Sequence, residues 1–224
     1  MAVLLNLIEM SEVKRQIRFQ FDREKSVAMM QYFIAQLGGR IPYLPVVKLA
    51  FFADRIHSRK HARPISHDIY YAFQWGPGGS SLMNLVNKEN AGLSPGWGIE
   101  HPSEYEVSLS RGIIPNEKKF SISDLEAIHF SLENFGRIAK GDRFDLAKLS
   151  HAYPEWAQHE WSFRLPGTKK RFDVSYADFL KNARKERKEF AWYRITDPFP
   201  ELSETEARDI AEEMEEYSNS LYAS

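Results

Sequence analysis

Residues 47–79 carry the strongest structural signal in this chain and read VKLAFFADRIHSRKHARPISHDIYYAFQWGPGG. Apolar residues fall at helical spacing around the start of this stretch: Val46, Leu49, Ala50, Phe52, Ala53 and Ile56. Pro45 suits the first position of such a helix, where a missing N–H group is no loss. The pattern predicts a buried core helix over residues 45–58.

An aromatic run follows at residues 69–73, and the sequence Trp75-Gly76-Pro77-Gly78-Gly79 ends it. Aromatic residues favour strands, whereas Gly and Pro interrupt them, so we expect a strand and then a tight turn at residues 75–79. These glycines could instead cradle a phosphate at the start of the next helix. Neither the P-loop nor the dinucleotide-binding pattern is present, which favours the turn.

The composition restricts the class of protein. The chain has 224 residues, of which 43% are hydrophobic and 13% aromatic, and this content is sufficient for a packed core. The net charge of −1 disfavours a dedicated nucleic-acid-binding protein, since such proteins are usually basic. The absence of cysteine excludes disulfides, thiolate nucleophiles and Cys-based metal sites. No signal-peptide pattern or membrane-length apolar run is found, so we expect a cytoplasmic protein that contacts no membrane.

The remaining periodicities predict an α+β fold that is mainly α-helical, a helical domain with a small antiparallel β-sheet. Further strands are expected at residues 16–22 and 105–109, and residues 172–174 are ambiguous. We expect a loop at residues 90–102. Further helices are predicted at residues 23–37, 80–87 with Ser80 or Ser81 as cap, 123–140 with a capping box from Ser123, 145–159 with a break near Pro154, 176–190, and from Ser203 onward.

The order of these pieces resembles the Panacea domain of the SocA-like antitoxins, which also occurs in phage-associated GepA proteins. The matching residues form four blocks: Lys48, Leu49, Phe52, Ala53 and Asp54; Pro64 and Ile65; Tyr71, Ala72, Trp75, Gly76 and Pro77; and Leu149, Ser150, His151 and Trp156. The resemblance extends over residues 24–180. One departure is Gly78, since members usually place valine after Gly-Pro.

The resemblance implies three parts. Residues 1–23 would be an N-terminal extension with a strand, residues 24–190 the Panacea domain, and residues 191–224 an acidic C-terminal helix. Lys48, Asp54, Trp75, Gly76, Pro77 and His151 would be structural motif residues.

Two groups of histidines are the best candidates for chemistry. His57 and His61 are four residues apart on one helix, with Asp54 and His67 nearby, and could grip a metal ion. However, the H-E-x-x-H pattern is absent, and basic residues also suit a helix C-terminus for electrostatic reasons. His151 and His159 have no paired nucleophile, so a structural role is favoured. We therefore expect no catalytic residue, metal or cofactor.

Opposite charges gather near the C-terminus. Residues 181–188 are rich in Lys and Arg, whereas residues 201–216 hold eight carboxylates and one arginine. The two segments could pack as antiparallel helices and neutralise each other, or recruit a charged partner. Candidate partner-binding residues are Trp97, Trp156, Trp161, Arg184, Lys185 and Lys188.

The resemblance implies a non-enzymatic, prophage-associated antitoxin that neutralises a cognate toxin by direct binding. Three alternatives stay open. The first is an adaptor that delivers the toxin to the ClpXP protease. The second is a DNA-binding autoregulator, which would use the basic segment. The third is a histidine-based, metal-dependent hydrolase.

Overall fold

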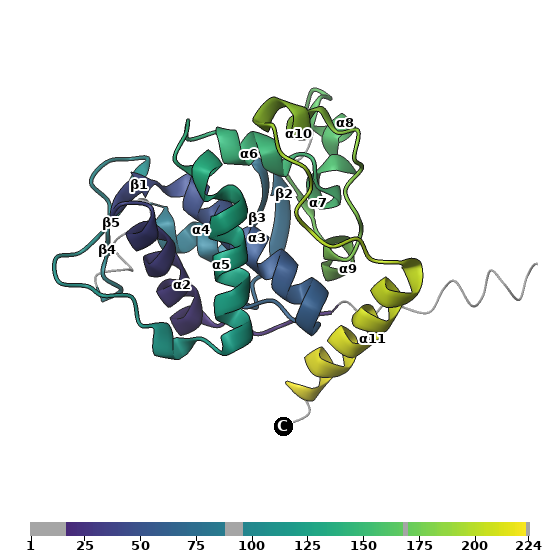
Figure 1. Cartoon of the computed structure of the whole chain (residues 1–224), viewed down its shortest axis with the longest axis horizontal. Helices are drawn as coiled ribbons and strands as arrows, with labels where there is room; N and C mark the ends of the chain where they lie inside the picture. The colour runs from purple at the N-terminus through teal and green to yellow at the C-terminus, as the bar shows by residue number, and fades with distance from the viewer. Residues whose placement is uncertain (1–16, 88–95, 168–169, 223–224) are drawn as a thin grey trace, which may run out of the picture.

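The computed structural model describes residues 17–87, 96–167 and 170–222. Over these residues the chain forms a mainly α-helical α+β fold with two three-stranded antiparallel sheets, which confirms the predicted fold class (Figure 1). None of the helices in this described part is both long and apolar enough to span a membrane.

Helix α3 (Tyr43–His61) is the centre of the molecule. Every residue from 44 to 59 is buried, so the predicted core helix is confirmed and is three residues longer at its C-terminal end. Helices α2 (Arg23–Gln36) and α5 (Ile122–Ala139) pack along it, and both were predicted to within a few residues (Figure 1). Phe52 of α3 stacks on Phe135 of α5 with ring centroids 3.9 Å apart.

One sheet lies at the end of the molecule where α3 begins. Its strand order is β1 (Arg40–Pro42), β5 (Glu106–Leu109) and β4 (Ile99–Glu100), with Ile41 opposite Val107. Strand β5 was predicted. The predicted loop at residues 90–102 lies partly outside the described residues, and β4 occupies part of the rest, so a loop was wrong there.

The second sheet corrects the predicted turn at residues 75–79. Strand β2 (Tyr70–Phe73) pairs with β3 (Gly76–Gly79) and with β6 (Arg171–Asp173), and only Gln74 and Trp75 form the turn. All four residues of β3 are buried. Gly and Pro form a strand here because its backbone pairs with β2 while neighbouring elements approach closely where no side chain stands.

The remaining elements cover the core. They are α4 (Ser80–Val86), the 3-10 helix η2 (Glu117–Lys119), α6 (Asp145–Ser150), α7 (Pro154–Ala157), α8 (Glu160–Phe163), α9 (Tyr176–Phe179), α10 (Lys188–Tyr193) and α11 (Glu204–Ser220). The predicted break near Pro154 is confirmed, because α6 ends before it and α7 begins at it.

The predicted strand at residues 16–22 is wrong for residues 17–22, and residue 16 lies outside the described residues. The alternation has another cause. Phe19 is buried and stacks on His67 at 5.0 Å, and it also meets Tyr217 of α11. The backbone N–H of Arg18 donates to Ser218 Oγ at 3.1 Å. The segment is therefore held by α11 through side-chain contacts rather than by a sheet.

The predicted basic helix over residues 176–190 is also wrong, because α9 ends at Phe179 and α10 begins only at Lys188. The carbonyl groups of Phe179 and Lys181 accept hydrogen bonds from the guanidinium of Arg59, and Lys181 also accepts from Arg55. In a continuing helix these carbonyl groups would accept hydrogen bonds from backbone N–H groups further along the chain. The arginine side chains take their place as donors and so compete with helix formation.

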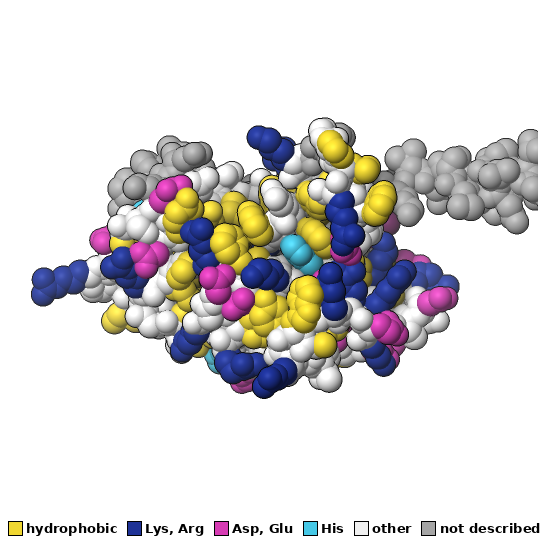
Figure 2. Space-filling view, turned by 90° about the horizontal axis from the view of Figure 1, so that it is seen from above, with side chains coloured by type: hydrophobic (Ala, Val, Ile, Leu, Met, Phe, Trp, Pro, Cys, Tyr) yellow, Lys and Arg dark blue, Asp and Glu magenta, His cyan; other side chains and the backbone are white. Residues whose placement is uncertain are grey.

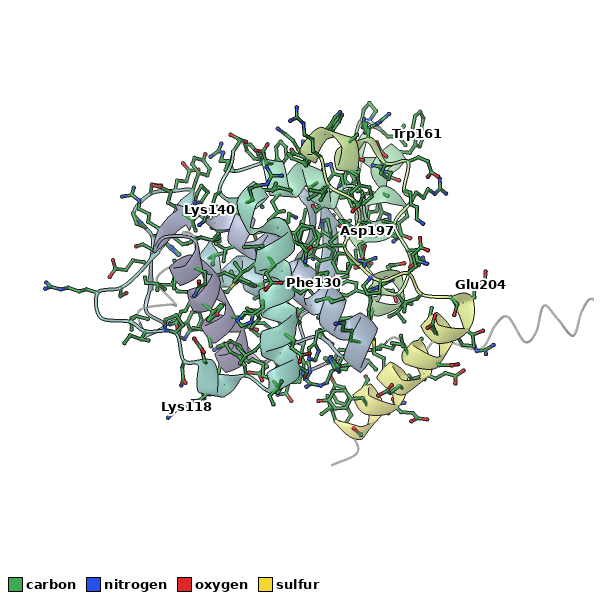
Figure 3. All side chains as sticks on the ribbon, viewed as in Figure 1. Lys118, Phe130, Lys140, Trp161, Asp197 and Glu204 are labelled. Atoms are coloured by element: carbon green, nitrogen blue, oxygen red, sulfur yellow. The ribbon has the colours of Figure 1, made fainter. Side chains whose placement is uncertain are left out.

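The acidic helix was predicted correctly. Its capping box joins Ser203 and Glu206 as expected. Of the two possibilities for the charged segments, antiparallel packing of two helices is not found in the part of the chain that the structure describes. The single ion pair between the two segments joins Lys185 to Glu201 at 2.6 Å, and Glu201 precedes α11. Glu204, at the start of the acidic helix, also lies well away from Trp161 of α8 (Figure 3).

The capping box of α5 begins two residues before the predicted one. Ser121 accepts a hydrogen bond from the backbone of Asp124, and the Asp124 carboxylate accepts one from the Ser121 N–H group. Ser123 therefore lies inside the helix, where its hydroxyl oxygen is 3.2 Å from His57 Nε2. A serine repeated at alternate positions made the two registers hard to distinguish from sequence.

Candidate functional site

Three of the four sequence blocks meet around the β2–β3 hairpin. Lys48 Nζ of α3 donates a 2.5 Å hydrogen bond to the carbonyl oxygen of Pro77. Trp156 Nε1 of α7 donates to the carbonyl oxygen of Phe73 at 2.9 Å. The sequence blocks that carry the family resemblance are therefore in direct contact. Both hydrogen bonds end on backbone carbonyl groups of the hairpin, not on its side chains.

Gly76 is the position where these elements come closest. Its φ is +88°, a conformation in which a side chain is strained. A Cβ atom there would lie 2.1 Å from Ser150 Oγ and 3.0 Å from Lys48 Nζ. Glycine is therefore required both by the backbone conformation and by the approach of α3 and α6.

Asp54 joins the remaining block to α3. Its buried carboxylate accepts hydrogen bonds from the backbone N–H groups of Ile65 and Ser66, at 2.7 and 3.0 Å, and from the hydroxyl groups of Ser66 and Tyr70. Burial raises the pKa of Asp54, and these hydrogen bonds oppose the rise. The carboxylate thus fixes the connector between α3 and β2.

The carboxylate of Asp68 lies at the N-terminus of α4, where the sequence left a phosphate site possible. Its carboxylate accepts from the backbone N–H groups of Ser81 and Leu82 at 2.9 and 2.7 Å. The predicted serine cap is wrong, because the cap residue is Gly79 and no side chain of the helix itself acts as a cap. An internal carboxylate takes the place that a bound phosphate would need.

Two buried arginines of α3 were not singled out from the sequence. Arg55 Nε donates to Glu155 Oε1 at 2.8 Å, and both side chains are fully buried. Arg59 donates to Asn182 Oδ1 at 2.8 Å and to the carbonyl oxygen of Pro200 at 2.5 Å. Burial lowers the pKa of Arg59 to about 10, with the charge of Arg55 adding to the effect. Arg55 and Arg59 are four residues apart, as charged residues on a solvent-exposed helix face often are, so the sequence did not indicate that they are buried.

His151 packs against Trp156 with ring centroids 3.6 Å apart and an interplanar angle of 3°. Burial, together with the nearby charges of Lys48 and Arg187, lowers the pKa of His151 to about 3. A base with so low a pKa is poorly matched to proton transfer at neutral pH. His151 is therefore suited to packing against Trp156 rather than to proton transfer.

The predicted metal-like histidines do not form a ligand set. His57 Nδ1 is 2.6 Å from the carbonyl oxygen of Arg63, and Nε2 is 3.2 Å from both Ser123 Oγ and Asp124 Oδ1. His61 lies beside it, with ring centroids 4.8 Å apart. Over the described ranges, no three His, Cys, Asp or Glu side chains are grouped so as to hold a metal ion. Both ring nitrogens of His57 are engaged within the fold.

The end of the molecule that carries α6, α8, α10 and the tip of the β2–β3 hairpin is different in character, and we call it the hairpin face (Figure 1). Seen from above, hydrophobic side chains cluster across the middle of the molecule with Lys and Arg among them (Figure 2). Four large aromatic side chains at this end are exposed: Trp161 70%, Trp192 59%, Trp75 45% and Tyr105 45%.

Two pockets flank the hairpin tip. The first, of about 410 Å³, is lined by Lys48, Trp75, Tyr105, Arg143 and Phe144 together with apolar residues of β1, α3 and α4. The second, of about 290 Å³, is lined by Gln74, His151, Trp156, Lys188, Trp192 and neighbours on α8. The turn residues Gln74 and Trp75 thus contribute to one pocket each.

The predicted partner-binding residues separate into two groups. Trp156 is buried and Trp97 is half-buried, with Arg23 5.5 Å from the Trp97 ring, so neither presents a fully exposed side chain to a partner. Trp161 lies at the hairpin-face end on α8 (Figure 3), and Lys188 stacks on Trp192 at 4.9 Å. Arg184 and Lys185 are exposed on the irregular segment between α9 and α10. Sequence reasoning missed Trp75, Tyr105 and Trp192 as exposed aromatics.

Comparison with known proteins gives one match. The family described as "Antitoxin SocA-like, Panacea domain" matches residues 46–157, which is half of the chain and contains α3, the hairpin, α5, α6 and α7. No curated protein matches the chain. No solved structure matches it either.

Proposed function

This chain belongs to the SocA-like antitoxin family with the Panacea domain, and we propose that it neutralises a cognate toxin protein by binding it directly through the hairpin face. The family name supports the antitoxin role. The supporting observation in the structure is that the motif residues and the exposed aromatic residues differ in burial. The shared motif residues on α3 and β3 are buried and hold the fold, whereas Trp75, Trp161 and Trp192 are exposed.

The hairpin face suits a protein partner for physical reasons. Trp, Tyr and Arg side chains dominate the affinity of protein interfaces, because they bury a large area and offer a polar group at the edge. The pockets beside Trp75 and Trp192 can receive side chains of a partner. Arg184, Lys185 and Lys188 would form a cationic border on one side, which suits an acidic surface on the toxin.

The antitoxin role can be tested in a host cell. Expression of the toxin gene, sought first beside the gene for this chain, should arrest growth, and co-expression of this chain should restore it. The two purified proteins should co-elute in size-exclusion chromatography. A harmless neighbour and no other co-purifying protein would contradict the proposal.

The same experiment distinguishes the adaptor role. A blocking antitoxin should rescue growth in a host without ClpXP, and the toxin should remain at full abundance. Rescue that is lost in the ClpXP-deficient host, together with a fall in toxin level in the normal host, would show delivery to the protease. In either case we place the protein in the cytoplasm, where ClpXP and a newly made toxin would meet it.

A further inference from the structure

The pocket between β1, the β2–β3 hairpin and α6 has an unusual distribution of charge. Two of its lining residues, Lys48 and Arg143, are cations, and no Asp or Glu lines it. No carboxylate in the described part of the chain forms an ion pair with either of them. The rest of the lining is apolar or aromatic, apart from the phenol groups of Tyr43 and Tyr105 and the backbone.

Lys48 lies at the inner wall of this pocket. Its side chain is 1% exposed, and its hydrogen bond to the Pro77 carbonyl uses one of the donors of the amine. Burial lowers the pKa of Lys48 well below 10.5 because no anion compensates the charge. A Cβ on Gly76 would lie 3.0 Å from Nζ, so the hairpin backbone packs directly against the amine, and both residues line the pocket.

Arg143 stands at the outer wall. Its guanidinium lies 4.2 Å from the Tyr105 ring centroid and 4.5 Å from that of Phe144, and Phe144 in turn packs on Trp75 at 4.6 Å. These aromatic contacts hold the guanidinium beside the pocket, and no carboxylate of the described residues forms an ion pair with it. The aromatic side chains form apolar walls beside it.

From this arrangement we propose that the pocket binds a small organic anion, a carboxylate carried on an aromatic or branched apolar body. The carboxylate accepts hydrogen bonds from Lys48 and Arg143, and the apolar body lies between Trp75, Phe144 and Met83. The volume of about 410 Å³ is in the range of small-molecule sites, which are mainly apolar with a few convergent polar groups. The carboxylate would supply the counter-charge that the pocket lacks.

This inference does not depend on the antitoxin role, and its test uses the purified full chain without any toxin. The probe is 3-phenylpropionate, and the comparison compound is the neutral amide 3-phenylpropanamide, which has the same shape and no charge. Binding is measured by isothermal titration calorimetry and by the NMR shift of the Trp75 indole N–H signal. The acid should bind saturably, and the amide about tenfold or more weakly, since it lacks the charge-assisted hydrogen bonds.

Matched variants locate the site. Arg143→Gln should weaken acid binding about tenfold, and Lys48→Met should do so at least as strongly if it folds. Arg164→Gln, which removes a cation from the neighbouring pocket, should leave acid binding unchanged. Equal binding of acid and amide, equal effects of the Arg143 and Arg164 variants, or no saturable binding of the acid would each overturn the proposal.

Discussion

Gly76 and Ser150 are in contact so close that a single methyl group cannot be added between them, because a Cβ on Gly76 would lie 2.1 Å from Ser150 Oγ. Ser150 Oγ is buried and donates to the Ala147 carbonyl at 2.6 Å, so it is not free to move away. The hairpin and α6 therefore approach each other at one glycine, which lies within the matched Panacea domain.

The first prediction concerns this contact. Gly76→Ala should lower the melting temperature more than Gly112→Ala, measured by differential scanning calorimetry. Both glycines have positive φ, +88° and +83°, so both variants carry a backbone penalty of about 1–3 kcal/mol. Only Gly76 has atoms in the way, whereas Gly112 faces open space. Equal losses in the two variants would show that α6 can move aside.

The second prediction concerns the buried pair Arg55 and Glu155. Glu155→Leu should destabilise the protein by about 3–5 kcal/mol in urea unfolding, because it leaves a buried guanidinium without its counter-ion. The double variant Arg55→Leu with Glu155→Leu should recover part of this loss. As a control, Glu201→Gln removes the exposed partner of Lys185 and should leave the unfolding midpoint unchanged. A single variant as stable as the wild type would contradict the role of the pair.

The third prediction concerns pH. Burial lowers the pKa of His151 from 6.5 to about 3 and that of His67 from 6.5 to about 4. In the pH range between these values and 6.5 the unfolded chain binds more protons than the folded one, so these two groups make stability fall as pH falls below 6.5. The raised pKa of the buried carboxyl of Asp54 opposes this effect.

The readout is therefore the slope of stability against pH rather than its level. Urea midpoints of the wild type, His151→Gln and His67→Gln are compared between pH 7.5 and about 5, above the range in which ordinary carboxylates titrate. Each variant should have a shallower slope than the wild type. Parallel curves for all three proteins would mean that neither histidine is held in its neutral form by the fold.

The fourth prediction tests the docking of α11. Met214 is fully buried and Ser218 bonds to the backbone of residue 18, so the acidic helix is part of the folded core. Met214→Ala should cost about 2–5 kcal/mol of stability, whereas the adjacent exposed change Glu213→Ala should have little effect. A chain ending at residue 202 should lose stability without gaining salt-dependent retention on DNA. Such retention would revive the autoregulator alternative.

The fifth prediction concerns the proposed interface. Once the toxin is identified, Trp192→Ala and Trp161→Ala should each weaken the complex by about thirtyfold, the effect of a residue worth about 2 kcal/mol. Ile122→Ala, an exposed apolar residue at the start of α5, is the matched control and should have no effect. Trp156→Phe should lower stability, because it loses the hydrogen bond to Phe73. If the Ile122 variant weakens the complex most, the interface lies elsewhere.

The sequence predicted the elements whose signal is local. The helix at residues 43–61 was expected from its apolar periodicity, and the start of the helix at residues 204–220 from the capping pattern of Ser203 and Glu206. It failed where contacts with another segment decide. Residues 76–79 read as a turn because Gly and Pro break strands, yet β2 supplies the pairing that makes them one. Residues 180–187 read as a helix, yet Arg55 and Arg59 take the carbonyls it would need.

The candidate site was predictable only in part, for a related reason. The buried motif residues are recognisable because their types and order are restricted by contacts, as at Gly76 and Asp54. The exposed residues are not so restricted. Trp192 and Trp156 are the same residue type, and it is the hydrogen bond to Phe73 together with the stack on His151 that makes Trp156 part of the core.

The partners of the α3 arginines bear on how the protein is made. Glu155 is 100 residues after Arg55, and Pro200 is 141 residues after Arg59. After α3 has been synthesised, most of the remaining chain must follow before these two guanidinium groups can meet their hydrogen-bond partners. Burying a charged group without such partners is unfavourable, so α3 cannot be buried before then. The core can therefore close only late in translation, and contacts so distant in sequence form slowly. During that interval the incompletely folded nascent chain would be open to proteases.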